Sequence, residues 1–154
     1  MRLGMPLVRH LDEFAGFLPK FGSLLALDIS KRRIGFAGTD VTRLLASPVE
    51  VWRRRKLADD VHRIAEHMRK REAVALVIGF PLEADGRFGP RAHSVEDTAK
   101  AIDAELGGVA IFLQDERWST VEADDRGGDD AMAATVILED TLKALGDLAD
   151  AGEA

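Results

Sequence analysis

Two short, apolar runs restrict the folds that this chain can adopt. Residues 23–29 are mostly apolar, and residues 73–78 form a continuous run of apolar and β-branched residues. Such runs are typical of strands that are covered on both faces, because a strand with one solvated face alternates apolar and polar side chains. The chain is therefore predicted to form a sheet with helices packed on its faces.

The segments around these two runs predict a mixed sheet. Apolar residues at helical spacing predict helices over residues 7–18, 57–71, 92–106 and 130–145, and one beginning within 118–125. Further strands are predicted over residues 34–38, 46–52 and 109–113, and Pro48 indicates an edge position for the second of these. Residues 79–90 contain several turn formers and predict a loop. The order predicts an α/β fold with a mixed five-stranded sheet, in which antiparallel hairpins precede parallel strands and helices flank the sheet.

The composition is that of one globular domain. The chain has 154 residues, of which 46% are hydrophobic and 31% charged, enough for a substantial core. We expect an N-terminal helical extension over 1–22, a central domain over 23–145, and a flexible acidic tail over 146–154.

Several classes of protein are disfavoured by what the sequence lacks. There is no cysteine, which excludes disulfides, thiolate metal sites and a cysteine nucleophile. No run of eighteen apolar residues occurs, so no membrane span is expected, and the N-terminus does not resemble a signal peptide. We expect a cytoplasmic protein that does not bind membranes.

Carboxylates occur at the ends of predicted elements. Asp28 ends the first apolar run, Glu116 follows the last predicted strand, and Asp130 opens the last helix. Carboxylates that converge from separate elements repel one another and lose hydration, and divalent cations remove that cost. Because Mg²⁺ prefers oxygen ligands, the pattern suggests a metal-dependent phosphodiester hydrolase holding one or two Mg²⁺ or Mn²⁺ ions.

The basic residues are clustered, although the net charge is −6. Runs of Lys and Arg occur at residues 31–33, 53–56 and 69–71, whereas acidic residues gather from Glu122 onward. A basic face beside an acidic metal site would suit a nuclease, because phosphate contacts require Lys and Arg. Each run alone is also compatible with an ordinary solvated surface.

Six motifs occur in the order typical of one family. They are Leu27-Asp28 with Arg33-Ile34-Gly35, Ser47-Pro48, Val77 to Leu82, Asp85-Gly86 with Gly89-Pro90, Asp115-Glu116-Arg117 with Ser119 to Ala123, and Asp130 with Ala133-Ala134 and Ile137-Leu138. Together they span about residues 24 to 142, and the chain resembles the YqgF/RuvX family. That family has an RNase H-like fold and is described both as Holliday junction resolvases and as pre-ribosomal-RNA nucleases.

The resemblance implies an activity and a site. It implies that Asp28, Glu116 and Asp130 bind Mg²⁺ or Mn²⁺ and that the chain is an endonuclease acting on structured RNA, namely the 5′ end of pre-16S ribosomal RNA. Cleavage of branched DNA as a Holliday junction resolvase is the alternative, and the chain would act as a monomer or homodimer. The substrate-binding residues would be Arg33, Lys31, Thr120 and Arg117.

Each carboxylate also has a structural interpretation. Asp28 could cap the turn that follows it, Glu116 could pair with Arg117, and Asp130 could be an ordinary helix cap. Asp115 is an alternative to Glu116, although neighbouring strand residues point to opposite faces and only one should reach the site. Asp129 competes with Asp130, since one could cap the helix while the other faces the metal.

The chain departs from the family pattern at three places. Ser30 replaces a usual glycine, Glu83 replaces a usual asparagine, and the segment 124–129 is short and acidic where the family has a longer basic one. These departures leave open a catalytically weak nucleic-acid-binding member of the family. An actin-like phosphotransferase is disfavoured, because the chain is too short for the two domains that enclose ATP there.

Overall fold

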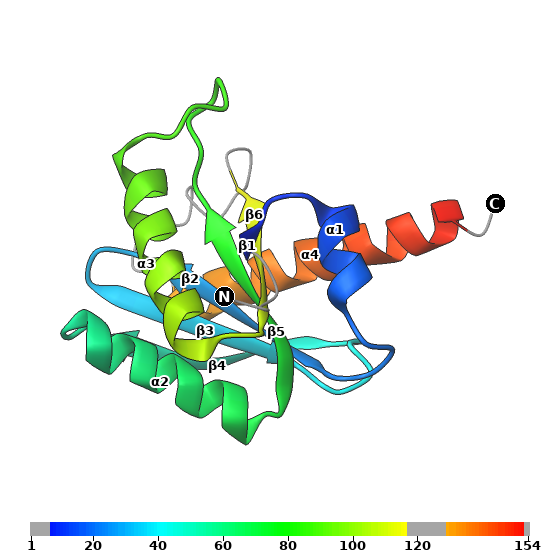
Figure 1. Ribbon diagram of the computed structural model, residues 1–154, viewed down its shortest axis with the longest axis horizontal. Coiled ribbons are helices and arrows are strands. Elements are labelled where there is room, and N and C mark those ends of the chain that lie inside the picture. The colour runs from blue at the N-terminus through cyan, green and yellow to red at the C-terminus, as the bar shows by residue number, and fades with distance from the viewer. Residues whose placement is uncertain (1–6, 117–128, 153–154) are drawn as a thin grey trace.

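The computed structural model describes residues 7–116 and 129–152 (Figure 1). In chain order the elements are β1 (Leu7–Val8), α1 (Leu11–Phe17), β2 (Ser23–Ile29), β3 (Arg33–Thr39), β4 (Ala46–Arg53), α2 (Leu57–Lys70), β5 (Ala73–Phe80), α3 (Pro90–Leu106), β6 (Ala110–Asp115) and α4 (Asp130–Gly152). Within the described residues, no helix is both long and apolar enough to span a membrane.

The described strands form one six-stranded mixed sheet in the order β1-β6-β5-β2-β3-β4. β2, β3 and β4 are successive antiparallel neighbours, whereas β5 runs parallel to both β2 and β6. This arrangement confirms the predicted α/β fold, in which hairpins precede parallel strands, and the edge position inferred from Pro48. The predicted number of strands was one too few.

The additional strand lies at the other edge of the sheet. Leu7 pairs with Ile111 and Val8 with Phe112, so β1 runs parallel to β6. The predicted helix over 7–18 was therefore wrong in its first part, because only Leu11–Phe17 is helical. The apolar pair at 7–8 satisfies the open backbone groups of β6, which a helix could not do. The boundaries proposed for the domain remain a prediction.

Apolar side chains fill both sides of the sheet. α2 and α3 cover one face, where Ile64 and Ile102 pack on Leu27 and Ile78. α1 and α4 cover the other, where Phe14 and Ile137 join the cluster that contains Ala26 and Val77 (Figure 1). This two-sided burial explains why β2 and β5 are continuous apolar runs.

α4 is longer than its apolar pattern predicted. The helix continues from Asp130 to Gly152, whereas the sequence predicted an end at 145 and a flexible tail over 146–154. The segment after Leu145 projects beyond the sheet (Figure 1). The prediction was wrong for residues 146–152, because the glycines and acidic residues there do not interrupt an already nucleated helix.

Polar side chains attach α2 to the edge strand β4. Arg63 Nε donates a hydrogen bond to Glu50 Oε2 at 2.9 Å, and His67 Nε2 lies 2.6 Å from the same oxygen. Burial raises the pKa of the Glu50 carboxyl, but the hydrogen bonds from Arg63 and His67 outweigh it and hold that pKa below its usual range.

The second attachment is built around Asp60, whose side chain is fully buried. Its carboxylate accepts hydrogen bonds from Trp52 Nε1 at 3.0 Å, Arg54 Nε at 3.0 Å and the backbone N–H of Arg55 at 2.9 Å. Arg54 Nη1 also donates to the carbonyl oxygen of Ser30 at 3.1 Å. Arg54 therefore joins α2, the end of β4 and the turn between β2 and β3.

Arg54→Met should destabilise the fold, because it leaves the buried Asp60 carboxylate without its cation. Breaking a buried pair from one side costs about 3 kcal/mol of unfolding free energy. The control is Arg53→Met, at an exposed neighbouring position, which should change that free energy by less than about 0.5 kcal/mol. Urea unfolding of both variants tests this, and equal midpoints would show that Asp60 does not depend on Arg54.

Candidate active site

Asp28 is the last residue but one of β2, and its side chain is half-buried. Its neighbours Leu27 and Ile29 belong to the core beneath α2 and α3, whereas Leu24 and Ala26 belong to the core beneath α4. Since strand side chains alternate between faces, Asp28 lies on the face that α4 covers. This is the end of the sheet at which the parallel strands β2, β5 and β6 finish.

Glu116 lies on the same face. It follows β6 directly, and its backbone N–H donates to the carbonyl of Phe80 at 3.0 Å, which extends the β5–β6 pairing by one position. A Cβ placed on Gly79 would lie 3.6 Å from Glu116 Cγ and 2.5 Å from Ile137 Cδ1 of α4. The Glu116 side chain is therefore beside Gly79 and beneath α4, and the residue is only 7% exposed. Asp115 is exposed, and alternation directs it to the opposite face.

The expectation that Glu116 faces Asp28 across adjacent strands was wrong. β5 lies between β2 and β6, so the two backbones are separated by two strand spacings, roughly 10 Å. Gly79 is the β5 residue at this level, since the preceding pair is Leu27 with Ile78. Because Gly79 has no side chain, the space between the two carboxylates on the α4 face is open.

Asp129 and Asp130 have different roles at the start of α4. Asp129 Oδ1 accepts a hydrogen bond from the backbone N–H of Ala131 at 2.9 Å, and the carbonyl of Asp129 accepts from Met132 and Ala133. Asp129 is therefore the N-cap. The carboxylate of Asp130 is not needed as a cap and is available for other contacts.

Asp130 is paired with Arg33. Arg33 Nε lies 2.7 Å from Asp130 Oδ2, and the two side chains are 55% and 17% exposed, respectively. Gly35 brings this helix end to the sheet, because a Cβ there would lie 1.9 Å from the carbonyl oxygen of Asp130. Gly35 is also the register partner of Asp28. Asp130 and Asp28 thus lie at the same end of the sheet.

The three predicted ligands share this end, but they do not form a closed coordination shell. Within residues 7–116 and 129–152, no three Asp, Glu or His side chains are close enough together to hold a metal ion. The donor set nevertheless fits a hard divalent cation, because it consists of carboxylate oxygens, one of them on a buried residue, around the gap left by Gly79. The role of all three as ligands remains a prediction.

Two of the predicted substrate-binding residues border this end of the sheet. Arg33 contacts Asp130, and Lys31 is exposed on the turn between β2 and β3. Arg117 and Thr120 lie outside the described residues, as does the helix predicted to begin within 118–125.

The departures at Ser30 and Glu83 have structural explanations. The Ser30 hydroxyl donates to the Arg33 carbonyl at 3.0 Å and accepts from the Arg33 N–H at 3.1 Å, so serine closes the hairpin turn itself. Ser30 has no positive φ, and glycine is not required there. The Glu83 side chain lies against Gly89, which precedes α3, where the helix dipole favours a negative charge.

The sequence analysis did not identify Gly35 and Gly79 as site residues. Both lie inside strands, and at both a Cβ would collide with α4. Glycine within a strand pattern is a recognised signal of close approach by another segment, so these positions could have been found from the sequence.

The fold and the arrangement of carboxylates define an RNase H-like protein. Residues 22–144 match the model of the family described as "RuvX: Holliday junction resolvase". The chain belongs to this family.

Curated relatives match nearly the whole chain. A protein of Acidiphilium cryptum is 38% identical over 148 residues, covering 88% of this chain and 93% of the relative. One of Rhodospirillum centenum is 37% identical over 163 residues, covering 94% and 87%. Both are named "Putative pre-16S rRNA nuclease".

Solved structures support the fold. Thermus thermophilus RuvC is 10% identical with a TM-score of 0.52, and the match covers 80% of this chain and 96% of RuvC. RuvC from T. thermophilus in complex with a Holliday junction substrate is 11% identical with a TM-score of 0.50, covering 80% and 93%. At these identities, the likeness extends to the fold alone.

Gly35→Ala should destabilise the protein by displacing the start of α4. The new methyl group would meet a backbone carbonyl, and overpacking of this kind costs about 1–3 kcal/mol of unfolding free energy. The control is Gly146→Ala in the same helix, where no atom lies within 4 Å and the change should stabilise by about 1 kcal/mol. Thermal denaturation should give shifts of opposite sign, and an unchanged melting temperature in Gly35→Ala would contradict the contact.

Proposed function

We propose that this protein is a metal-dependent endonuclease that hydrolyses phosphodiester bonds in structured nucleic acid, with the 5′ end of pre-16S ribosomal RNA as its substrate. One observation supports this most directly: Asp28 and Glu116 lie on the same face of the sheet, on either side of Gly79, at the end where the parallel strands finish. The names of the relatives agree with it. A ribosomal-RNA substrate also fits the cytoplasmic location expected from the sequence.

Asp28 and Glu116 would hold one or two Mg²⁺ or Mn²⁺ ions, with Asp130 as the third ligand. A divalent ion supplies a Lewis acid for the phosphate oxygens and lowers the pKa of water. The aspartate is on the central strand and the longer glutamate is two strands away. Their different lengths suit ligands that must reach a common point above Gly79.

In hydrolysis, the oxygen of water bonds to phosphorus, and the P–O3′ bond breaks to leave a 3′-hydroxyl and a 5′-phosphate. The protein's own groups orient this step and balance its charge. Arg33 lies 2.7 Å from Asp130 and is 55% exposed, so its guanidinium can turn to a phosphate oxygen at the rim of the site. The buried Glu116 carboxylate has a fixed position, which limits reorganisation during the reaction.

Holliday junction cleavage is the second candidate function. The family description names it, and the fold resembles that of RuvC. The same carboxylates would act on DNA. Symmetric cleavage of a junction needs two sites, so this function requires a homodimer, whereas processing of one RNA end can be done by a monomer.

Glu116→Gln should abolish cleavage of a labelled pre-16S RNA fragment in Mn²⁺. Loss of a direct metal ligand should cost more than the roughly 10–100-fold that loss of an outer-shell partner costs. The matched control is Asp115→Asn, which removes the same charge from the neighbouring, exposed position and should retain activity. Initial rates for the wild type and both variants provide the measurement.

The assay should run in parallel on a four-way DNA junction. Cleavage of RNA alone supports the ribosomal function, and cleavage of the junction alone supports the resolvase. Full activity in Glu116→Gln would overturn the site. Absence of cleavage on both substrates, with binding retained, would indicate a catalytically weak nucleic-acid-binding protein.

Metal binding can be measured without activity. Mn²⁺ should raise the melting temperature of the wild type, since a ligand at one hundred times its Kd stabilises the native state by about 2.7 kcal/mol. The increase should be lost in Glu116→Gln and kept in Asp115→Asn. An equal increase in all three proteins would locate Mn²⁺ binding elsewhere.

A further inference from the structure

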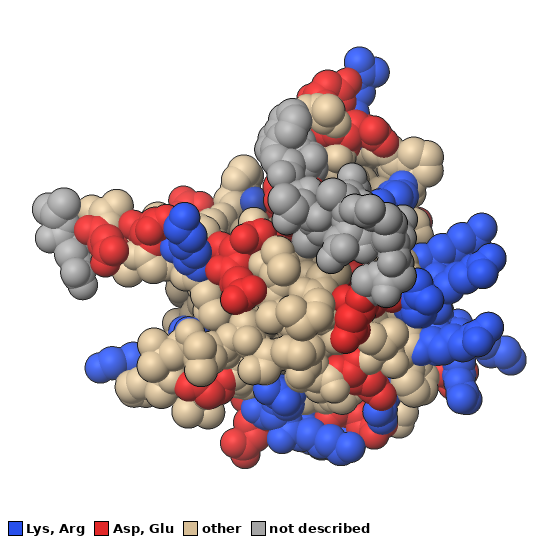
Figure 2. Space-filling model, turned by 180° about the vertical axis from the view of Figure 1, so that it is seen from behind, with Lys and Arg blue, Asp and Glu red and all other residues tan. Residues whose placement is uncertain are grey.

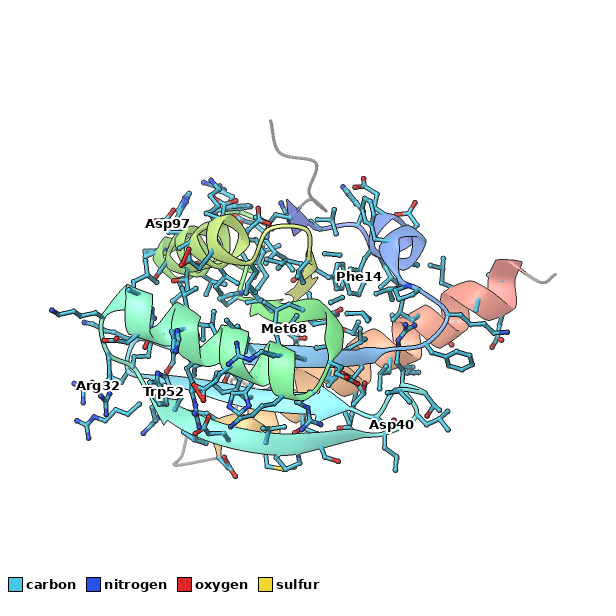
Figure 3. The ribbon with its side chains drawn as sticks, turned by 60° about the horizontal axis from the view of Figure 1, so that its bottom comes forward. Phe14, Arg32, Asp40, Trp52, Met68 and Asp97 are labelled. Atoms are coloured by element: carbon cyan, nitrogen blue, oxygen red, sulfur yellow. The ribbon has the colours of Figure 1, made fainter. Side chains whose placement is uncertain are left out.

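A hollow lined by basic side chains lies beside the carboxylates. It has a volume of about 770 Å³ between the β2–β3 turn and the end of β4. We call it the basic groove, and its lining residues are Lys31, Arg32, Arg33, Val51, Arg53, Arg54 and Arg55. Lys and Arg side chains gather at this end of the molecule, on the right in Figure 2, and Figure 3 shows Arg32 projecting outward there.

Most of these cations have no opposite charge beside them. Arg33 is paired with Asp130 and Arg54 with Asp60. Among the described residues, no carboxylate forms an ion pair with Lys31, Arg32 or Arg53. This is notable in a chain of net charge −6, because most surface cations on such a protein would have acidic neighbours.

The pairing of β3 with β4 brings like charges together. Arg33 and Arg53 are direct register partners, and the N–H of Arg54 donates to the carbonyl of Arg32 at 2.8 Å. Like charges directly opposite on neighbouring strands reduce stability. An anionic ligand would relieve this repulsion.

The groove is held in shape by buried contacts. Arg54 contacts Asp60 at 3.0 Å and the Ser30 carbonyl at 3.1 Å, which ties both walls of the groove together. The guanidinium of Arg55 lies 5.5 Å from the centre of the Trp52 ring. The backbone that supports the free cations is therefore rigid, and a bound polyanion would not have to order it.

The basic groove is continuous with the candidate active site. Arg33 lines the groove and also touches Asp130, and Ser30 is separated from Asp28 by one residue. A chain of phosphates in the groove would lead to the end of the sheet where the carboxylates lie.

We propose that the basic groove binds the sugar–phosphate backbone of the nucleic-acid substrate next to the bond to be cleaved. Lys31, Arg32, Arg53 and Arg55 contact phosphates, and Arg54 is a positioning residue that holds the groove through Asp60. The inference rests on the proposed function, since it assumes a nucleic-acid substrate. A row of guanidinium groups suits phosphates, which they bind in a bidentate manner, better than a flat membrane surface or a peptide with dispersed charges.

The test measures binding in EDTA, where cleavage does not occur. The variant is Arg32→Gln combined with Arg53→Gln, and the control is Lys20→Gln combined with Arg69→Gln, which removes two exposed cations outside the groove. Fluorescence anisotropy over a potassium chloride series gives the affinity for a labelled pre-16S fragment and for a four-way DNA junction. Each lost phosphate contact lowers the slope of log K against log salt by about 0.7 to 0.9, so the groove variant should lose about 1.4 to 1.8.

The control variant should keep the slope of the wild type. Equal slopes in the groove variant and the control would overturn the proposal, and would leave an acidic protein partner as the alternative ligand. The exposed positions chosen make loss of folding unexpected, and a thermal melt checks it. Arg55→Gln alone, with an expected loss of 0.7 to 0.9, provides a second, milder variant.

Failure of this proposal can be distinguished from failure of the proposed function. If the groove variant binds like the wild type while Glu116→Gln loses cleavage, the groove proposal is wrong and the nuclease stands. If the groove variant loses binding but the wild type cleaves neither substrate, the groove stands and the nuclease is wrong. A loss of slope on RNA only, or on the junction only, identifies which nucleic acid the groove accepts.

Discussion

The close approach of α4 to the sheet is the contact on which the site depends. The carbonyl of Asp130 occupies the place that a side chain at position 35 would fill, and Ile137 occupies the place above Gly79. Packing two elements this closely requires strand residues without a Cβ, which is costly in a sheet because glycine weakens a strand. The approach brings a helix start to the sheet beside Asp28 and leaves an open space between Asp28 and Glu116. The same two glycines thus determine both the packing and the geometry of the carboxylates.

Opposite charges are separated across a short distance at this end of the protein. The carboxylates lie beneath the start of α4, and the basic groove lies on the hairpin formed by β3 and β4. The ion pair between Arg33 and Asp130 marks the boundary. Because Arg33 is more than half exposed, this pair contributes little to stability, and either partner can exchange it for a ligand at small cost. The boundary can therefore respond to bound phosphate.

Much of this arrangement follows from local sequence. The uninterrupted apolar runs of β2 and β5 predicted buried strands, and the capping chemistry of two adjacent aspartates predicted that one would cap α4 and leave the other available. Features that depend on pairing between distant segments could not be predicted. Leu7–Val8 is too short to distinguish a strand from the first turn of a helix, and its structure is determined by the open edge of β6. The insertion of β5 between β2 and β6 is a matter of topology, and it changed the expected distance between Asp28 and Glu116.

The basic groove illustrates the same limit. Two separate runs of Lys and Arg are ambiguous in the sequence, because either alone could be solvated surface. The β3–β4 register places Arg33 opposite Arg53, and the buried Asp60 fixes the chain that follows. A buried ion pair is weak evidence of stability, because desolvation offsets most of the attraction. Its better-supported role is to specify one geometry, and here the geometry specified is that of the surface cations. The Arg54–Asp60 pair is therefore best understood as the structural support of the groove, and the neighbouring unpaired arginines as the groups that this support presents to a ligand.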